Sequence, residues 1–150
     1  MTVVQTTVEV EAPLERVWAV VSDPRNLPHW DRHIVAVTGV PPGGLEPGLK
    51  YTTDVRFMGV SSRISATVLE LQPKRFAKIR LTGLMDGIVE TTVEGMGNGR
   101  TRLTQKVDYR FAGGPIGLFA AEAVRNLGAG AVLKRGVMAQ KREAEAAVGA

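Results

Sequence analysis

The segment NLPHWDRHI, residues 26–34, contains both histidines of the chain, His29 and His33. Four residues make about one helical turn, so on one helix the two imidazoles would share a face and could serve a metal ion or a proton transfer. A metal site needs three or four ligands, and the only further candidate ligand close to the two histidines in the sequence is Asp31. On a helix Asp31 should point away from that face, and the helix should end before His33. We therefore interpret the segment as structural, predict no metal site, and keep His33 as a candidate for proton transfer.

Residues 2–11 alternate between apolar and polar side chains, which predicts a half-buried strand. Pro13 suits the first turn of a helix, and apolar residues at three- and four-residue spacing predict a short helix to about Ser22. Asp23 is placed to cap a second short helix that runs through Trp30 and Asp31. Period-two patterns separated by turn residues then predict six further strands: 34–40, 50–58, 60–71, 76–82, 88–94 and 101–111.

The final part of the chain changes to a helical period. A helix of about 30 residues, near 45 Å long, is expected to reach about Ala147. One stripe of this helix comprises Phe119, Ala123 and Leu127. Three glycines are also predicted to lie inside it: Gly128, Gly130 and Gly136. They leave volume under the helix, either for close packing on the sheet or for a ligand.

The length and composition of the chain fit one domain, residues 1–150. The formal net charge is +4, and the chain has no cysteine. Disulfides and thiolate catalysis are therefore excluded. The N-terminus lacks the pattern of a signal peptide, and charged residues interrupt the most apolar later stretch, so we expect a cytoplasmic protein without a transmembrane segment. No basic run is interleaved with aromatic residues, so we expect no nucleic acid partner. The oligomeric state is left open.

Three stretches carry a resemblance to a known family: VEVEAPLERVWAVVSDPRNLPHW (8–30), LELQPKRFAKIRL (69–81) and GNGRTRLTQKVDYRF (97–111). With the long final helix, they resemble the START-like or SRPBCC superfamily, and in particular its polyketide cyclase/dehydrase branch. The resemblance implies an α+β helix-grip fold: a curved antiparallel sheet of about seven strands, with two short helices after the first strand. The C-terminal helix would then pack across the sheet over a hydrophobic cavity. Trp30 matches an aromatic position that closes this cavity or packs the helix pair.

Strand alternation places apolar side chains on one face of the predicted sheet and charged ones on the other. Four arginines are therefore expected in water as cross-strand ion partners: Arg56, Arg63, Arg80 and Arg110. A bulge near Gly59 or Gly87 would exchange the two faces downstream. The candidate ligand-binding residues are those of the apolar face, the cavity mouth and the final helix: Trp30, Phe57, Ile64, Ile79, Leu81, Val89, Thr91, Leu103, Gln105, Val107, Phe119, Ala123 and Leu127.

Two functions from different classes fit these residues, and neither needs a cofactor. The first is a carrier or sequestering protein that buries a lipid-, sterol- or polyketide-like molecule. The second is a polyketide cyclase/aromatase or dehydratase, in which Tyr51, Tyr109 or His33 would supply a hydrogen bond or a proton. A regulatory or toxin–antitoxin role is a third possibility on which the residues do not bear.

Overall fold

The computed structural model describes residues 2–57, 59–111, 121 and 128–148. Its strands are β1 (Thr2–Val10), β2 (Ile34–Thr38), β3 (Lys50–Phe57), β4 (Val60–Gln72), β5 (Phe76–Gly83), β6 (Met85–Gly97) and β7 (Arg100–Phe111). The helices are α1 (Leu14–Val21), the 3₁₀ turn η1 (Pro24–Asn26), α2 (Leu27–Trp30) and α4 (Ala129–Val148). The predicted element order is confirmed, and every predicted strand is present.

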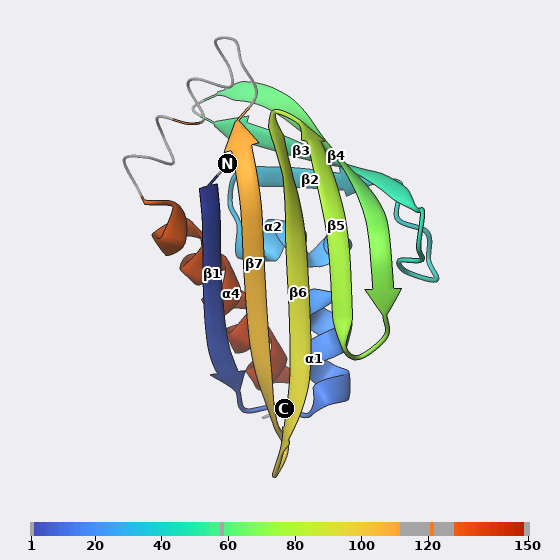
Figure 1. The fold of residues 1–150 in the computed structure, drawn as a ribbon, viewed down its shortest axis with the longest axis vertical. Helices are drawn as coiled ribbons and strands as arrows, with labels where there is room; N and C mark the ends of the chain where they lie inside the picture. Colours follow the sequence, from blue (N-terminus) through green and yellow to red (C-terminus); the bar gives the residue numbers. More distant parts are fainter. Residues whose placement is uncertain (1, 58, 112–120, 122–127, 149–150) are drawn as a thin grey trace.

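The strands form one antiparallel seven-stranded sheet in the order β1-β7-β6-β5-β4-β3-β2. Strands β3 to β7 follow one another as a meander, and β1 closes the far edge against β7 over its whole length. Figure 1 shows the sheet bending across β2, β3 and β4. Such a curved sheet has a concave face that a helix can occupy.

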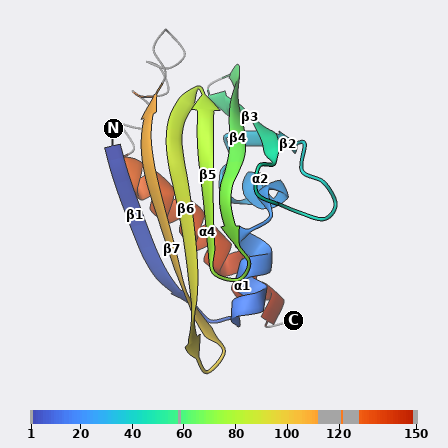
Figure 2. The same ribbon diagram turned by 45° about the vertical axis from the view of Figure 1, so that its right-hand side comes forward.

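Helices α1 and α4 lie on the same, inner face of the sheet (Figure 2). The largest core cluster joins Val17 of α1 and Val137 of α4 to Val10, Val93 and Leu103 of the strands. This cluster lies where β1 runs into α1, so the helices close one end of the inner face. The helix-grip architecture implied by the resemblance is therefore present.

Strand register keeps the predicted faces in place. Shifts occur between Ile34 and Ala36, Val68 and Glu70, and Gly95 and Gly97. The β6–β7 pairing, by contrast, runs without interruption through Gly87. A Cβ at this glycine would collide with the carbonyl oxygen of Asp108, which explains glycine there. The bulge considered at Gly87 is therefore absent, and side chains downstream of it stay on their predicted sides.

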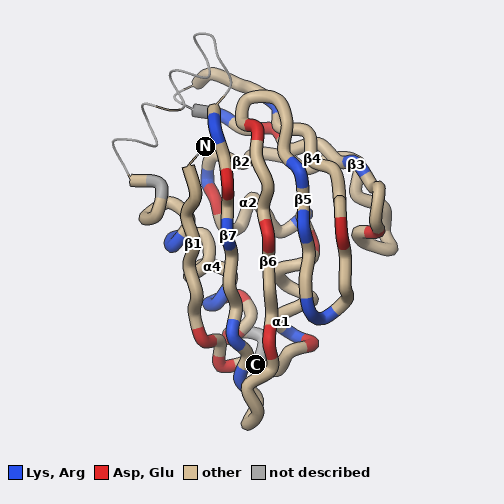
Figure 3. The backbone as a smooth tube through the Cα atoms, viewed as in Figure 1, with Lys and Arg blue, Asp and Glu red and all other residues tan. Residues whose placement is uncertain are grey.

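Figure 3 shows charged residues at intervals along β5, β6 and β7. Strand alternation places these residues on the outer face. Arg63 Nε lies 3.0 Å from Asp54 Oδ1 across β3 and β4, and Arg110 Nη2 lies 3.7 Å from Asp86 Oδ2 across β6 and β7. All four predicted outward arginines are exposed. Such exposed pairs contribute little to stability, but they keep charge off the inner face.

The final helix differs from its prediction at Gly128. This residue has a φ of +84°, which an α-helix does not accommodate, and α4 begins one residue later. The predicted continuous helix through Gly128 is therefore wrong, and its earlier part, except for Ala121, lies outside the described residues. A Cβ at Gly130 or Gly136 would meet no heavy atom of the described residues within 4 Å, so close packing on the described sheet does not explain these two glycines.

Glu143 of α4 holds the short helix α2 in place. Its Oε2 accepts a 2.6 Å hydrogen bond from Nε1 of Trp30, and its Oε1 lies 3.1 Å from Nδ1 of His29. Trp30 is only 8% exposed, so its indole N–H needs this protein acceptor. We refer to the contact of Glu143 with Trp30 and His29 as the Glu143 bridge.

Replacement of Glu143 by alanine should lower the free energy of unfolding by about 2 kcal/mol, because the buried indole N–H loses its acceptor. Glu143→Gln keeps an acceptor for the indole N–H, so its free energy of unfolding should fall by less than half as much. The control is Glu94→Ala, which removes an exposed carboxylate 3.7 Å from Arg102 and should cost under about 0.5 kcal/mol. Urea denaturation measures all three. Equal values for Glu143→Ala and Glu94→Ala would contradict the role of the bridge.

Candidate ligand-binding site

A row of apolar side chains crosses the middle of the inner face. Strand pairing places Val107 opposite both Val4 and Val89. Val89 is in turn opposite Ile79, and Ile79 is opposite Val68. Val68 is buried, whereas the other four are partly exposed. We call these five residues the cross-strand row; three of them, Ile79, Val89 and Val107, are among the candidate ligand-binding residues.

Burial decreases along the strands from the closed end of the inner face to the other. On β7, Leu103 is fully buried, Gln105 is 9% exposed, and Val107 is partly exposed. The same order holds on β6 for Val93, Thr91 and Val89. The closed core therefore ends at the level of Thr91 and Gln105. Beyond that level, Val107, Val89 and Ile79 retain accessible surface, whereas Val68 and Ala66 are buried in a second core cluster.

Three buried polar side chains meet where the closed core ends. Gln105 Nε2 donates to Thr91 Oγ1 at 3.2 Å, and Gln140 Nε2 of α4 approaches Gln105 Oε1 at 3.5 Å. Gln140 is 4% exposed, and its Oε1 has no hydrogen-bond partner in the described part of the chain. A buried amide oxygen without a donor is costly, so this atom requires an explanation. We call Thr91, Gln105 and Gln140 the polar trio.

Tyr51 packs in a second core cluster with Ala66 and Val68. It is 6% exposed, and burial raises the pKa of its phenol well above the ordinary value. The phenol therefore stays protonated at neutral pH. Of the roles predicted for Tyr51, hydrogen-bond donation fits this environment, whereas proton abstraction by a phenolate does not.

Tyr109 lies at the more accessible end of β7. Its ring meets Phe111 edge-on, with ring centroids 5.6 Å apart and planes at 74°. The side chain is partly exposed, unlike that of Tyr51. Tyr109 and Gln105 are both on β7, on the same face, so Tyr109 stays a candidate for contact with a ligand.

The two histidines do not share a helical face. α2 ends at Trp30, and Asp31 already has extended backbone angles (φ −140°, ψ 115°). Because the helix has ended, Asp31 turns toward His33: Asp31 Oδ1 lies 2.9 Å from both the backbone nitrogen and Nδ1 of His33. The expected divergence of Asp31 from His33 is therefore wrong, while the predicted helix end before His33 is confirmed. No group of three or more metal-ligating side chains exists among the described residues.

The other candidate residues fall into different environments. Trp30 and Leu103 are enclosed in the main core cluster, where a ligand would have to displace helix packing. Ile64 packs against a small cluster of Val55 and Leu84, and Leu81 packs against the Tyr51 cluster. Phe57 is placed on β3 by its backbone alone. Phe119, Ala123 and Leu127 lie outside the described residues.

Sequence reasoning missed Gln140. Val137, Gln140 and Ala144 are all buried at three- and four-residue spacing, so they share one face of α4. An amide within an otherwise apolar helical stripe was the available signal. What the spacing did not reveal is that Gln140 faces Gln105, because that contact joins residues 35 positions apart.

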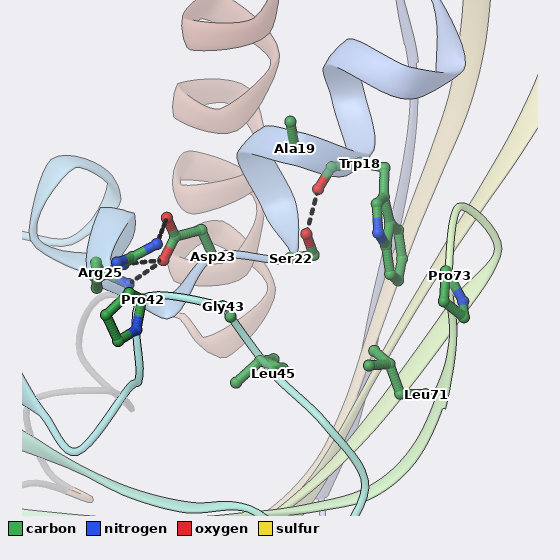
Figure 4. Close-up of a pocket in the computed structure, with 11 residues that line it drawn as sticks. Trp18, Ala19, Ser22, Asp23, Arg25, Pro42, Gly43, Leu45, Leu71 and Pro73 are labelled. Atoms are coloured by element: carbon green, nitrogen blue, oxygen red, sulfur yellow. Dashed lines mark hydrogen bonds and ion pairs between the residues drawn. The ribbon is translucent and has the colours of Figure 1, made fainter.

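A separate surface cleft of about 280 Å³ lies between α1, η1, the β2–β3 loop and the β4–β5 turn (Figure 4). Trp18, Leu45 and Leu71 form apolar walls, and the Asp23–Arg25 ion pair lies on one side. Hydrogen bonds from the Arg25 side chain hold the pKa of Asp23 below its usual value. None of the candidate site residues lines this cleft.

The match to a family model decides the family of this chain. Residues 1–145 match the model described as polyketide cyclase/dehydrase and lipid transport. The chain belongs to that family. No curated protein matches it in sequence. Among the described helices, none is long and apolar enough to span a membrane.

Solved structures share the fold at low sequence identity. A START superfamily protein from Mycobacterium smegmatis is 22% identical, with a TM-score of 0.73 over 97% of this chain and 98% of that one. A protein from Thermus thermophilus is 16% identical, with a TM-score of 0.74 over 97% and 99%. The ZhuI aromatase/cyclase from a Streptomyces species is 17% identical, with a TM-score of 0.67 over 94% of each chain.

The raised pKa of Tyr51 predicts a loss of stability at alkaline pH. Above about pH 10 the phenol ionises in the unfolded chain but not in the folded one, so the unfolded state is favoured as pH rises. This contribution amounts to about 1.4 kcal/mol per pH unit. Urea denaturation between pH 8 and 11 should show that the free energy of unfolding falls less steeply with pH in Tyr51→Phe than in the parent protein. Tyr109→Phe retains Tyr51 and should decline like the parent protein; identical slopes for all three would contradict the burial of Tyr51.

Proposed function

We propose that this protein binds a hydrophobic small molecule on the inner face of its sheet, as a carrier or sequestering protein. The single observation that carries the proposal is the partial exposure of apolar side chains in the cross-strand row, beyond the end of the closed core. Apolar side chains that face inward yet remain accessible are typical of a binding surface. The family description, which includes lipid transport, supports the same class of ligand.

The distribution of charge also favours an uncharged ligand. Outer-face ion pairs such as Arg63–Asp54 and Lys78–Glu90 leave the inner face of the same strands apolar. The polar groups that the described strands direct inward near the row are neutral: Thr6, Thr91, Gln105 and Tyr109. A charged ligand placed there would lose its hydration without gaining a counter-ion. Binding is therefore driven by the burial of apolar surface, about 25 cal/mol for each Å² removed from water.

A polar substitution in the cross-strand row tests this proposal. Val89→Thr combined with Val107→Thr replaces two methyl groups by hydroxyls at nearly constant volume. Each lost apolar contact is worth about 0.8 kcal/mol, so the Kd for the uncharged fluorescent probe N-phenyl-1-naphthylamine should rise about ten-fold. Fluorescence titration measures this Kd, and thermal unfolding verifies that the variant is folded.

The matched control is Ile88→Thr, which changes the neighbouring residue on the outer face of β6, opposite Asp108 and Arg80. Its Kd for the probe should change less than two-fold. Absence of probe binding to the parent protein would contradict the proposed function. Equal effects of the inner and outer substitutions would place the binding site elsewhere.

A cyclase is the second candidate function, and one contact favours it. Asp31 Oδ1 holds Nδ1 of His33 at 2.9 Å, an arrangement that orients an imidazole for proton transfer. The similarity to an aromatase/cyclase points to a poly-β-ketone as the class of substrate. In such a reaction the apolar inner face would fold the chain so that the reacting carbons meet.

This second function predicts a clear loss in a triple variant. If the protein cyclises an aromatic polyketide precursor, Tyr51→Phe, Tyr109→Phe and His33→Ala together should lower turnover at least about 100-fold, because general acid–base catalysis contributes that much. Product formation is followed by liquid chromatography with mass spectrometry, with Ile88→Thr as the folded control. Turnover that survives the triple substitution would exclude these three residues from the mechanism.

A further inference from the structure

We propose that the polar trio recognises a hydroxyl group at the leading end of the ligand, and that Gln140 makes the decisive hydrogen bond. This inference rests on the proposed function and deepens it, since it names the ligand class: an uncharged, largely apolar molecule with a phenol or alcohol at one end. The juxtaposition that carries it is the unpartnered amide oxygen of Gln140 at the boundary between closed core and accessible inner face, within the described part of the chain.

The polar trio lies at the boundary between the closed core and the accessible part of the inner face. Thr91 and Gln105 are directly opposite each other on β6 and β7, and both are next to the cross-strand row. On the closed side of them lies Leu103, and on the accessible side lies Val107. A molecule lying along the accessible inner face would therefore have the polar trio at its inner end. An apolar ligand end would leave Gln140 unsatisfied, whereas a hydroxyl would satisfy it.

One helical turn before Gln140, the described part of the chain leaves open space beside α4. Gly136 precedes Gln140 by one helical turn, and a Cβ at Gly136 would meet no heavy atom within 4 Å among the described residues. Gly136 itself is partly exposed, although Val137 beside it is fully buried. A glycine in a helix lowers helix propensity, so its presence where nothing packs favours a role in leaving room. A ligand group beside Gly136 would be next to the amide of Gln140.

The hydrogen-bond chain determines which ligand group fits. Gln140 Nε2 is directed to Gln105 Oε1, and Gln105 Nε2 donates onward to Thr91 Oγ1, so the free atom at the start of the chain is an acceptor. A hydroxyl group can donate to that oxygen. If both amides were turned over, the free atom would be a donor, and the same hydroxyl could accept from it. A hydroxyl therefore satisfies the trio in either arrangement, whereas an ionised carboxylate or ammonium would remain without a counter-ion.

The test compares two molecules that differ by one hydroxyl group. 2-Naphthol and naphthalene each compete with N-phenyl-1-naphthylamine in a fluorescence displacement assay. In the parent protein, 2-naphthol should bind at least ten-fold more tightly than naphthalene, because its hydroxyl gains a buried partner. In Gln140→Leu the preference should disappear, while naphthalene binds as tightly as before. The control is Gln72→Leu, at the exposed end of β4, which should retain the preference.

The outcomes separate this inference from the function on which it rests. If the probe binds but 2-naphthol and naphthalene compete equally well, or if Gln140→Leu keeps the preference, the hydroxyl-recognition inference is wrong and hydrophobic binding stands. If the probe does not bind at all, the proposed function fails, and the inference fails with it. Thermal unfolding accompanies each variant, and Gln140→Met replaces Gln140→Leu if the leucine variant does not fold.

Discussion

The alternation of side chains along an antiparallel strand is the constraint on which the rest of this structure depends. One face of each strand is exposed to solvent, and the ion pairs of Arg63, Lys78 and Arg110 lie on that face. The other face is therefore largely apolar, with a few neutral polar groups such as Thr91 and Gln105. The described helices close only one end of that face, around Val10 and Leu103. The partial exposure of Ile79, Val89 and Val107 follows from this incomplete cover, and it is the physical basis for a binding role.

The histidine segment contributes to this arrangement through packing. The Glu143 bridge fixes α2 to α4 through one short hydrogen bond from Trp30 and a second contact with His29. α2 has only four residues and would not be stable alone, so the tertiary contact determines its position. His33 follows the helix end, where Asp31 orients its ring. Two histidines that are close in sequence thus contact different side chains, Glu143 and Asp31.

Local patterns in the sequence were sufficient to predict the strands, their faces and the helix end before His33, because alternation and capping act over a few residues. They were insufficient for Gly128, whose positive φ interrupts a helical pattern that the neighbouring residues continue. They also did not reveal the Gln140–Gln105 contact or the Glu143 bridge, which join α4 to distant segments. Tertiary packing decides such pairs, and a single sequence records only their residue types.

Methyl NMR of the protein under xenon shows whether the inner face of the sheet is an accessible apolar surface, because xenon enters such sites without needing a particular ligand shape. The methyl groups of Ile79, Val89 and Val107, which are partly exposed on the inner face, should show xenon-dependent shifts. The methyl groups of Val10, Val17 and Leu103, in the closed core, should not shift. Unshifted methyl groups along the cross-strand row, or equal shifts at the outer-face Ile88, would contradict an apolar binding surface inside the sheet.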